Sequence, residues 1–98
     1  MINITIGADV IEARGHGKDE TGCAIVSAML YALAGGLENS FAHPAWEIGD
    51  GYARIEVPRT PMAQGMKLMT EVGLEQVARK RDDVEIDYAS MRHASVLL

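Results

Sequence analysis

The chain has 98 residues, of which 48% are hydrophobic, and a formal net charge of −5. A chain of this length and composition folds as one domain around one core, which excludes an intrinsically disordered protein. The acidic balance argues against a nucleic-acid partner, because such binding depends on clustered lysines and arginines. No uninterrupted apolar run approaches the roughly 18 residues of a membrane span, and the first residues lack the features of a secretion signal. We therefore expect a cytoplasmic protein without a membrane partner.

The first part of the chain predicts two strands and a helix. Ile2–Ile6 alternates isoleucine with smaller or polar residues, as a half-buried strand does. Val10–Arg14 has the composition of a second strand, and a glycine-containing loop follows it. Next, Thr21 or Asp19 can cap a helix that runs from about residue 22 to about residue 33 and ends at the glycine pair behind it.

The second part predicts a β-hairpin, a second helix and a last strand. Ala45–Ile48 and Tyr52–Val57 flank a glycine-containing turn, as hairpin strands do. Thr60-Pro61 opens the helix, and the basic residues 79–81 lie at its end, where cations complement the helix dipole. Val84–Tyr88 follows as a short strand at a sheet edge. The helix carries an apolar stripe that we assign to the core and not to a binding groove: Met62, Met66, Met69, Gly73 and Val77.

The order of these elements predicts an α+β fold over residues 1–98, taken as a single domain. Two strands, a helix, two strands, a helix and a short strand suit a two-layer sandwich. We expect one mixed or antiparallel sheet of four to five strands with both helices on one face.

Cys23 is the single cysteine, and it lies at the start of the first predicted helix. One cysteine forms neither an internal disulfide nor a structural zinc site, which fits a reducing compartment. A helix N-terminus favours a thiolate, so this position suits a nucleophile. A lone helical cysteine is also often a small buried residue of the core. The residues alone leave both interpretations open.

His16 precedes Cys23 in a glycine-rich loop and is the natural base for it, although it also fits an exposed loop histidine. Asp19 and Glu20 either cap the helix or orient the imidazole, and capping is the commoner role. The loop glycines either hold an extended peptide or let the chain turn: Gly15, Gly17 and Gly22. The three histidines, which include His43 and His93, lack metal-ligand spacing, so neither a metal nor another cofactor is expected.

At these residues the chain resembles the ribosomal-processing cysteine protease family of bacteria and some phages. The family signature is a Gly-His pair at a strand end, a glycine-containing loop with an acidic residue, and Cys-Ala-x-x-Ser opening a helix. Here the signature is matched by Gly15-His16 and by Cys23-Ala24-Ile25-Val26-Ser27. Gly73–Ala78 is similar to a family segment before the last strand. The specific part of the match is the segment from His16 to Ser27.

The resemblance implies a homodimeric Cys–His protease with this two-layer fold. It assigns the nucleophile to Cys23, the general base to His16 and a supporting role to Ser27. Family members remove a short N-terminal extension from a ribosomal protein, cutting after an aromatic residue. Glu20 stands where the family has an aspartate, and the loop before Cys23 is shorter than in typical members. The alternative function is therefore a catalytically weak or inactive relative that binds a peptide or protein.

Overall fold

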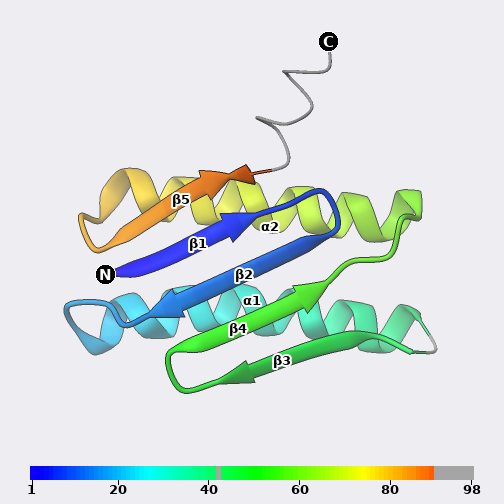
Figure 1. The fold of residues 1–98 in the computed structure, drawn as a ribbon, viewed down its shortest axis with the longest axis horizontal. Helices are drawn as coiled ribbons and strands as arrows, with labels where there is room; N and C mark the ends of the chain where they lie inside the picture. The colour runs from blue at the N-terminus through cyan, green and yellow to red at the C-terminus, as the bar shows by residue number, and fades with distance from the viewer. Residues whose placement is uncertain (42, 90–98) are drawn as a thin grey trace, which may run out of the picture.

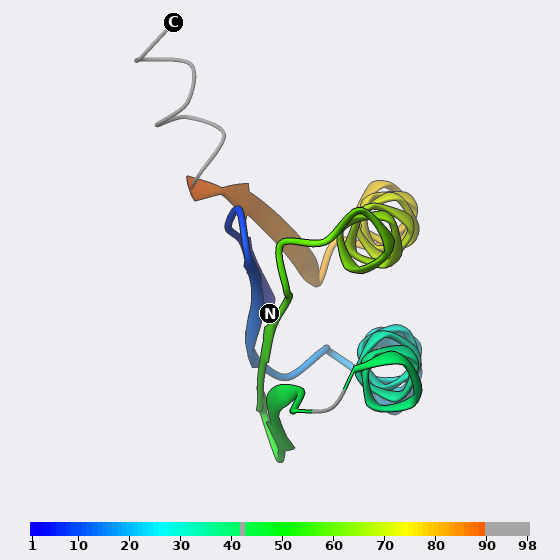
Figure 2. The ribbon, with the colours of Figure 1, turned by 90° about the vertical axis from the view of Figure 1, so that its right-hand side faces the viewer.

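The computed structural model describes residues 1–41 and 43–89, and it shows two layers (Figures 1 and 2). Both helices cover one face of a five-stranded sheet, and within residues 1–41 and 43–89 no helix lies on the other face. The predicted α+β architecture is thus confirmed. His93 and the rest of residues 90–98 lie outside the described part of the chain. The elements are β1 (Ile2–Ile6), β2 (Val10–Gly15), α1 (Glu20–Ser40), β3 (Ala45–Gly49), β4 (Tyr52–Glu56), α2 (Pro61–Lys80) and β5 (Val84–Tyr88).

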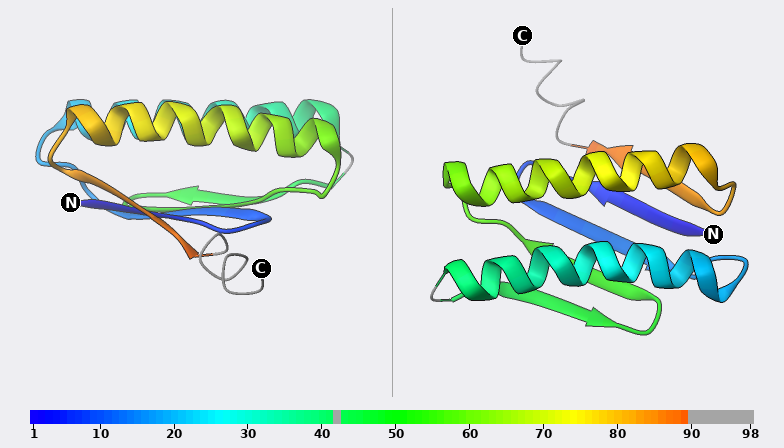
Figure 3. Two further views of the ribbon diagram at one scale, coloured as in Figure 1. Left: turned by 90° about the horizontal axis from the view of Figure 1, so that it is seen from above. Right: turned by 180° about the vertical axis from the view of Figure 1, so that it is seen from behind.

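The sheet has the strand order β3-β4-β2-β1-β5 and is mixed. Neighbouring strands are antiparallel except for β1 and β5, which run parallel with Ile2 opposite Val84. A parallel pair requires a crossover, and α2 supplies the one that returns the chain to the far edge of the sheet (Figure 3). The predicted hairpin is confirmed as β3 and β4, and the predicted edge strand is confirmed as β5.

The core lies between the sheet and the two helices. The alternation predicted for the first strand is observed, with each isoleucine of β1 buried and the residues between them exposed. Side chains of both helices pack onto this surface, and burial of each large one stabilises the fold by about 1.5–3 kcal/mol. The largest fully buried residues are Ile4, Ile6, Ile11, Leu37, Ile55 and Leu74.

α1 is longer than predicted, because it continues through Gly35 and Gly36 to Ser40. Its N-cap is Asp19, one of the two candidates, and the Asp19 side chain accepts a hydrogen bond from the Gly22 N–H. A helical glycine costs only about 1 kcal/mol relative to alanine. Burial of Leu37 in the last turns outweighs that cost, so the glycine pair does not end the helix.

The observed α1 is long and apolar enough to pass a length-and-composition test for a membrane-spanning helix. In the structure one side of this helix is part of the core, as a core helix of the same composition would be. The buried residues on that side are Gly22, Val26, Leu30, Leu33, Ala34 and Leu37.

The predicted core stripe of α2 is wrong for two of its methionines. Met62 and Met69 are exposed, with 61% and 74% of their surface accessible. The buried residues of α2 are Ala63, Lys67 and Leu74, which share a neighbouring face of the helix. An unbranched apolar side chain such as methionine fits either face, so the prediction chose the wrong one. The buried Lys67 ammonium forms an ion pair with the Glu71 carboxylate one turn later.

Candidate active site

The Cys23 thiol lies in the first turn of α1 and is half-buried. Its sulfur accepts a hydrogen bond from the Gly17 backbone N–H, with N and Sγ 3.2 Å apart. The N–H groups of an α-helix that lack a partner are those of its cap and first three residues, which here precede Cys23. An amide of the preceding loop, not a helix amide, therefore points at the sulfur. The Gly17 N–H is thus a donor whose hydrogen bond a sulfur at this position can accept.

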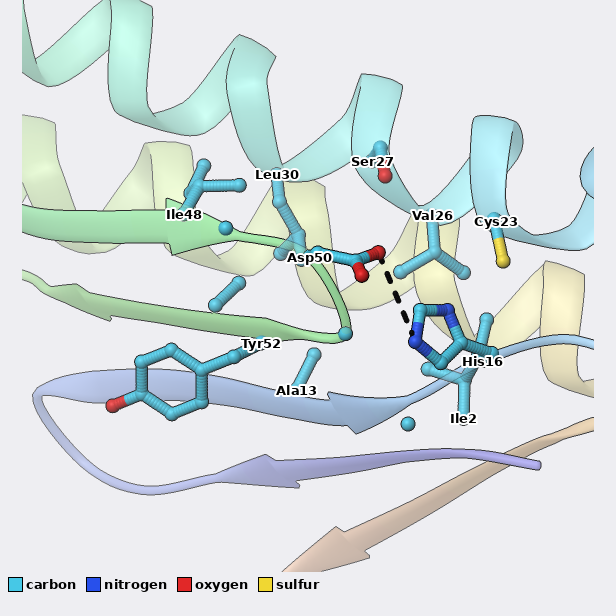
Figure 4. A pocket seen from close by; sticks show the side chains of 14 residues that line it. Ile2, Ala13, His16, Cys23, Val26, Ser27, Leu30, Ile48, Asp50 and Tyr52 are labelled. Atoms are coloured by element: carbon cyan, nitrogen blue, oxygen red, sulfur yellow. Dashed lines mark ion pairs between the residues drawn. The ribbon is translucent and has the colours of Figure 1, made fainter.

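His16 lies where β2 gives way to the loop, and its side chain is 59% exposed. Its Nε2 atom is 3.8 Å from Oδ1 of Asp50, in the turn between β3 and β4 (Figure 4). The ring also lies against Gly51, where an added Cβ would be 2.7 Å from Nε2. The sequence suggested that His16 could meet Cys23. In the described residues the ring instead faces the hairpin turn, and no hydrogen bond joins it to the sulfur.

His16 and Cys23 nevertheless line one cavity of about 130 Å³ between the start of α1 and the hairpin turn. Ser27, one turn after Cys23, lines the same cavity, as does Asp50 from the opposite side (Figure 4). The apolar part of the lining comes from the sheet and from α1. It consists of Ile2, Ala13, Val26, Leu30, Ile48 and Ala53. The cavity thus combines a thiol, an imidazole and a hydroxyl with an apolar floor.

The acidic residues before Cys23 act at the helix end. Asp19 caps α1, and its Oδ1 atom also accepts a hydrogen bond from Nη2 of Arg81 at 2.7 Å. The Gly22 N–H, followed by the Arg81 guanidinium, lowers the pKa of the Asp19 carboxyl below its ordinary value. Glu20 is an exposed residue of the first turn, where its charge complements the helix dipole. Capping is therefore the role that Asp19 has in this structure.

Asp83, which the sequence analysis did not single out, is a buried carboxylate beneath the loop. Its Oδ2 atom accepts the Lys18 backbone N–H at 2.8 Å, and its Oδ1 atom accepts Nε of Arg81 at 2.9 Å. These bonds, the one from Arg81 first, hold the pKa of Asp83 far below its ordinary value. The residue lies two positions after Arg81, and nothing in its sequence context distinguishes it from a surface aspartate.

The loop glycines are explained by close packing. A Cβ at Gly17 or at Gly22 would lie 2.8 Å from Oδ2 of Asp83. Gly15 has a φ of 99°, and a Cβ there would lie 2.2 Å from the Met1 carbonyl oxygen. Each glycine therefore makes room for a neighbouring part of the protein itself. The other proposal for them, that they hold an extended peptide, is not needed to explain these positions.

The arrangement of the sheet and the two helices is that of a known class of small bacterial α+β proteins. Two crystal structures of the essential ribosomal processing protease Prp from S. aureus have this fold, one with a covalently linked product peptide and one with a substrate peptide. Their TM-scores are 0.78 and 0.80, at 21% and 17% identity, over 90% of this chain and 99% of theirs. SMU.848 from Streptococcus mutans has a TM-score of 0.63 at 19% identity, over 89% of this chain and 96% of its own.

No protein-family model and no curated protein matches this sequence. At identities of 17–21% the likeness to Prp establishes the fold. The fold that the family resemblance implied is therefore confirmed, from β1 to β5 and with both helices on one side.

Proposed function

We propose that this chain is a cysteine endopeptidase, a divergent member of the ribosomal-processing protease family. Its substrate would be the N-terminal extension of a ribosomal or phage protein. The observation that carries the proposal is that Cys23 and His16 line one cavity in a fold shared with Prp, which has been crystallised with substrate and product peptides. The apolar floor beside the thiol would receive a side chain of the substrate next to the cleaved bond.

In the proposed mechanism the Cys23 thiolate attacks the scissile carbonyl and forms a tetrahedral intermediate. His16 takes the thiol proton and then gives it to the leaving amine, so that a thioester remains. Water, deprotonated by His16, cleaves the thioester and releases the second product. The His16 ring has to turn from Asp50 towards the sulfur for these steps. Hydrogen bonds between catalytic groups are often long in the free enzyme and shorten in the substrate complex.

The supporting residues of the proposed site are Ser27 and the acidic pair at the helix start. The Ser27 hydroxyl faces the same cavity and can donate to a substrate carbonyl. Asp19 and Glu20 stabilise the N-terminus of α1, where Cys23 lies. On the basis of the family resemblance we also propose that the protein is a homodimer in a reducing cytoplasm, where a free thiol persists. Light scattering on the purified protein tests the dimer.

The experiment is cleavage of a precursor ribosomal protein that carries an N-terminal extension, with the product mass read by mass spectrometry. We expect cleavage by the wild type and none by Cys23→Ala. The cleavage rate of His16→Ala should be lower by at least about a hundredfold, which is the size of a general-base contribution. His43→Ala changes an exposed histidine of the loop after α1 and serves as the matched control. Equal activity of His16→Ala and His43→Ala would refute the dyad.

A peptide-binding protein without cleavage is the second candidate. It is favoured by the contact of His16 with the hairpin turn, which leaves the ring away from the sulfur. Pull-down of the same precursor separates the two functions. If Cys23→Ala retains an intact precursor that the wild type cuts, the protein is a protease. If both proteins retain it uncut, the protein is a binding module.

A further inference from the structure

The loop that carries His16 and leads to Cys23 is tied to the connection between α2 and β5. We propose that Asp83, held by Arg81, is a positioning residue that keeps the Gly17 N–H on the Cys23 sulfur. The proposal deepens the proposed function and rests on Cys23 being the reactive thiol. Asp83 does not touch the reacting atoms, because it acts through the loop backbone.

Two successive amides of the loop carry the argument. The Gly17 N–H donates to Sγ of Cys23 at 3.2 Å, and the Lys18 N–H donates to Oδ2 of Asp83 at 2.8 Å. The two N–H groups belong to adjacent peptide planes that meet at the Gly17 Cα, so only the φ and ψ angles of Gly17 separate them, and holding the second plane limits the positions open to the first. The bond to Asp83 therefore sets the direction from which an N–H reaches the sulfur.

The carboxylate is built firmly into the fold. Asp83 is 4% exposed, and each of its oxygens accepts at least one hydrogen bond. Arg81 spans two carboxylates, since its Nε donates to Asp83 and its Nη2 donates to Asp19. Asp19 in turn caps α1 through the Gly22 N–H. One guanidinium thus connects the end of α2 with the N-cap of α1 and, through Asp83, with the Lys18 backbone.

The Asp83 carboxylate packs closely against two loop glycines. A Cβ on either of two loop glycines, Gly17 or Gly22, would lie 2.8 Å from Asp83 Oδ2. The neighbouring Asp82 contrasts with it: its carboxylate is 80% exposed and pairs with the Lys18 ammonium at 2.6 Å. Asp82 has the same charge, lies in the same connection and contacts the same residue, but it holds a side chain and not the backbone.

The negative charge of Asp83, taken by itself, would disfavour a thiolate at Cys23. The groups around the thiol are His16 on the β2 side, Asp50 in the hairpin turn, and the Asp19–Arg81–Asp83 cluster. Arg81 offsets both carboxylates of that cluster. Removing Arg81 would leave the carboxylates of Asp19 and Asp83 without its compensating charge, whereas removing Asp83 would release the Lys18 N–H.

The test measures the rate of Cys23 alkylation by iodoacetamide from pH 5 to pH 10, which requires no substrate. We expect Asp83→Ala to lower the rate at neutral pH about tenfold, equivalent to about one unit in the half-maximal pH. Asp83→Asn keeps an acceptor for the Lys18 N–H and should recover part of the rate. Asp82→Ala, the matched control, should follow the wild type.

Circular dichroism of each variant establishes that it is folded. If Asp83→Ala does not fold, the near-isosteric Asp83→Asn and the uncharged Arg81→Gln carry the comparison with Asp82→Ala. Folded Asp83 and Arg81 variants with the profile of Asp82→Ala would overturn the positioning role. The proposed protease fails separately, through uncut precursor at a normal alkylation rate, so the two hypotheses are distinguishable.

Discussion

The Nε2 atom of His16 lies 3.8 Å from Oδ1 of Asp50, and the ring covers the backbone of the hairpin turn. This relationship joins the end of β2 to the β3–β4 turn across the mouth of the cavity. Both side chains are exposed, so an ion pair between them is weak and the ring can leave it at little cost. The hairpin turn therefore holds the imidazole only weakly.

Gly51→Ala should disturb the contact between His16 and the hairpin turn. Gly51 has a φ of 69°, and a Cβ there would lie 2.7 Å from His16 Nε2. We expect a loss of about 1–2 kcal/mol in the free energy of unfolding from the left-handed backbone, and a displaced ring. Urea denaturation measures the first effect, and the His16 NMR signals report the second. Gly49→Ala, with open space at its Cβ, is the control: it should neither lower the free energy of unfolding nor displace the ring.

Gly35→Ala tests the observed length of α1. Nothing lies within 4 Å of a Cβ at Gly35, and the residue is inside the helix. Alanine should raise the free energy of unfolding by about 0.5–1 kcal/mol, since it lowers the entropy of the unfolded chain. Thermal denaturation provides the measurement. A destabilised variant would indicate that the helix ends at the glycine pair, as the sequence analysis expected.

Leu74→Ala and Met69→Ala test which face of α2 is buried. Leu74 is completely buried, so its truncation should cost about 2–5 kcal/mol. Met69 is 74% exposed, and its truncation should change stability by less than about 0.5 kcal/mol. Chemical denaturation of the two variants supplies both values. Similar losses in the free energy of unfolding for both variants would indicate that the methionine stripe lies in the core.

Acidification should weaken the link between the Cys23 loop and the α2–β5 connection. Asp83, Asp19 and Asp82 all have pKa values below the ordinary 3.8, so their contribution to stability is present above that value. It is lost as the pH falls through the lower values of the folded protein. Denaturation between pH 5 and pH 2 should show this decline. Asp83→Asn should reduce its slope, and an unchanged slope would contradict the ionic role of Asp83.

The sequence predicted the elements well, because alternating isoleucines, a capped helix start and a glycine turn are local signals. Helix ends and faces were less predictable. Burial of Leu37 carries α1 through its glycines, and Met69 fits either face of α2. The thiol and the imidazole that line the cavity both come from the short segment that the sequence singled out as the candidate site. The ring's contact with Asp50 and the carboxylate of Asp83 depend on residues distant in sequence, which one sequence without its fold does not bring together.

The hydrogen bond between Lys18 and Asp83 joins residues 65 positions apart. During synthesis the thiol therefore leaves the ribosome well before the carboxylate that anchors its loop. The amide that faces the sulfur is fixed only after α2 has crossed the sheet and β5 has docked beside β1. A half-made chain would therefore carry Cys23 without the carboxylate that holds its loop in the folded protein.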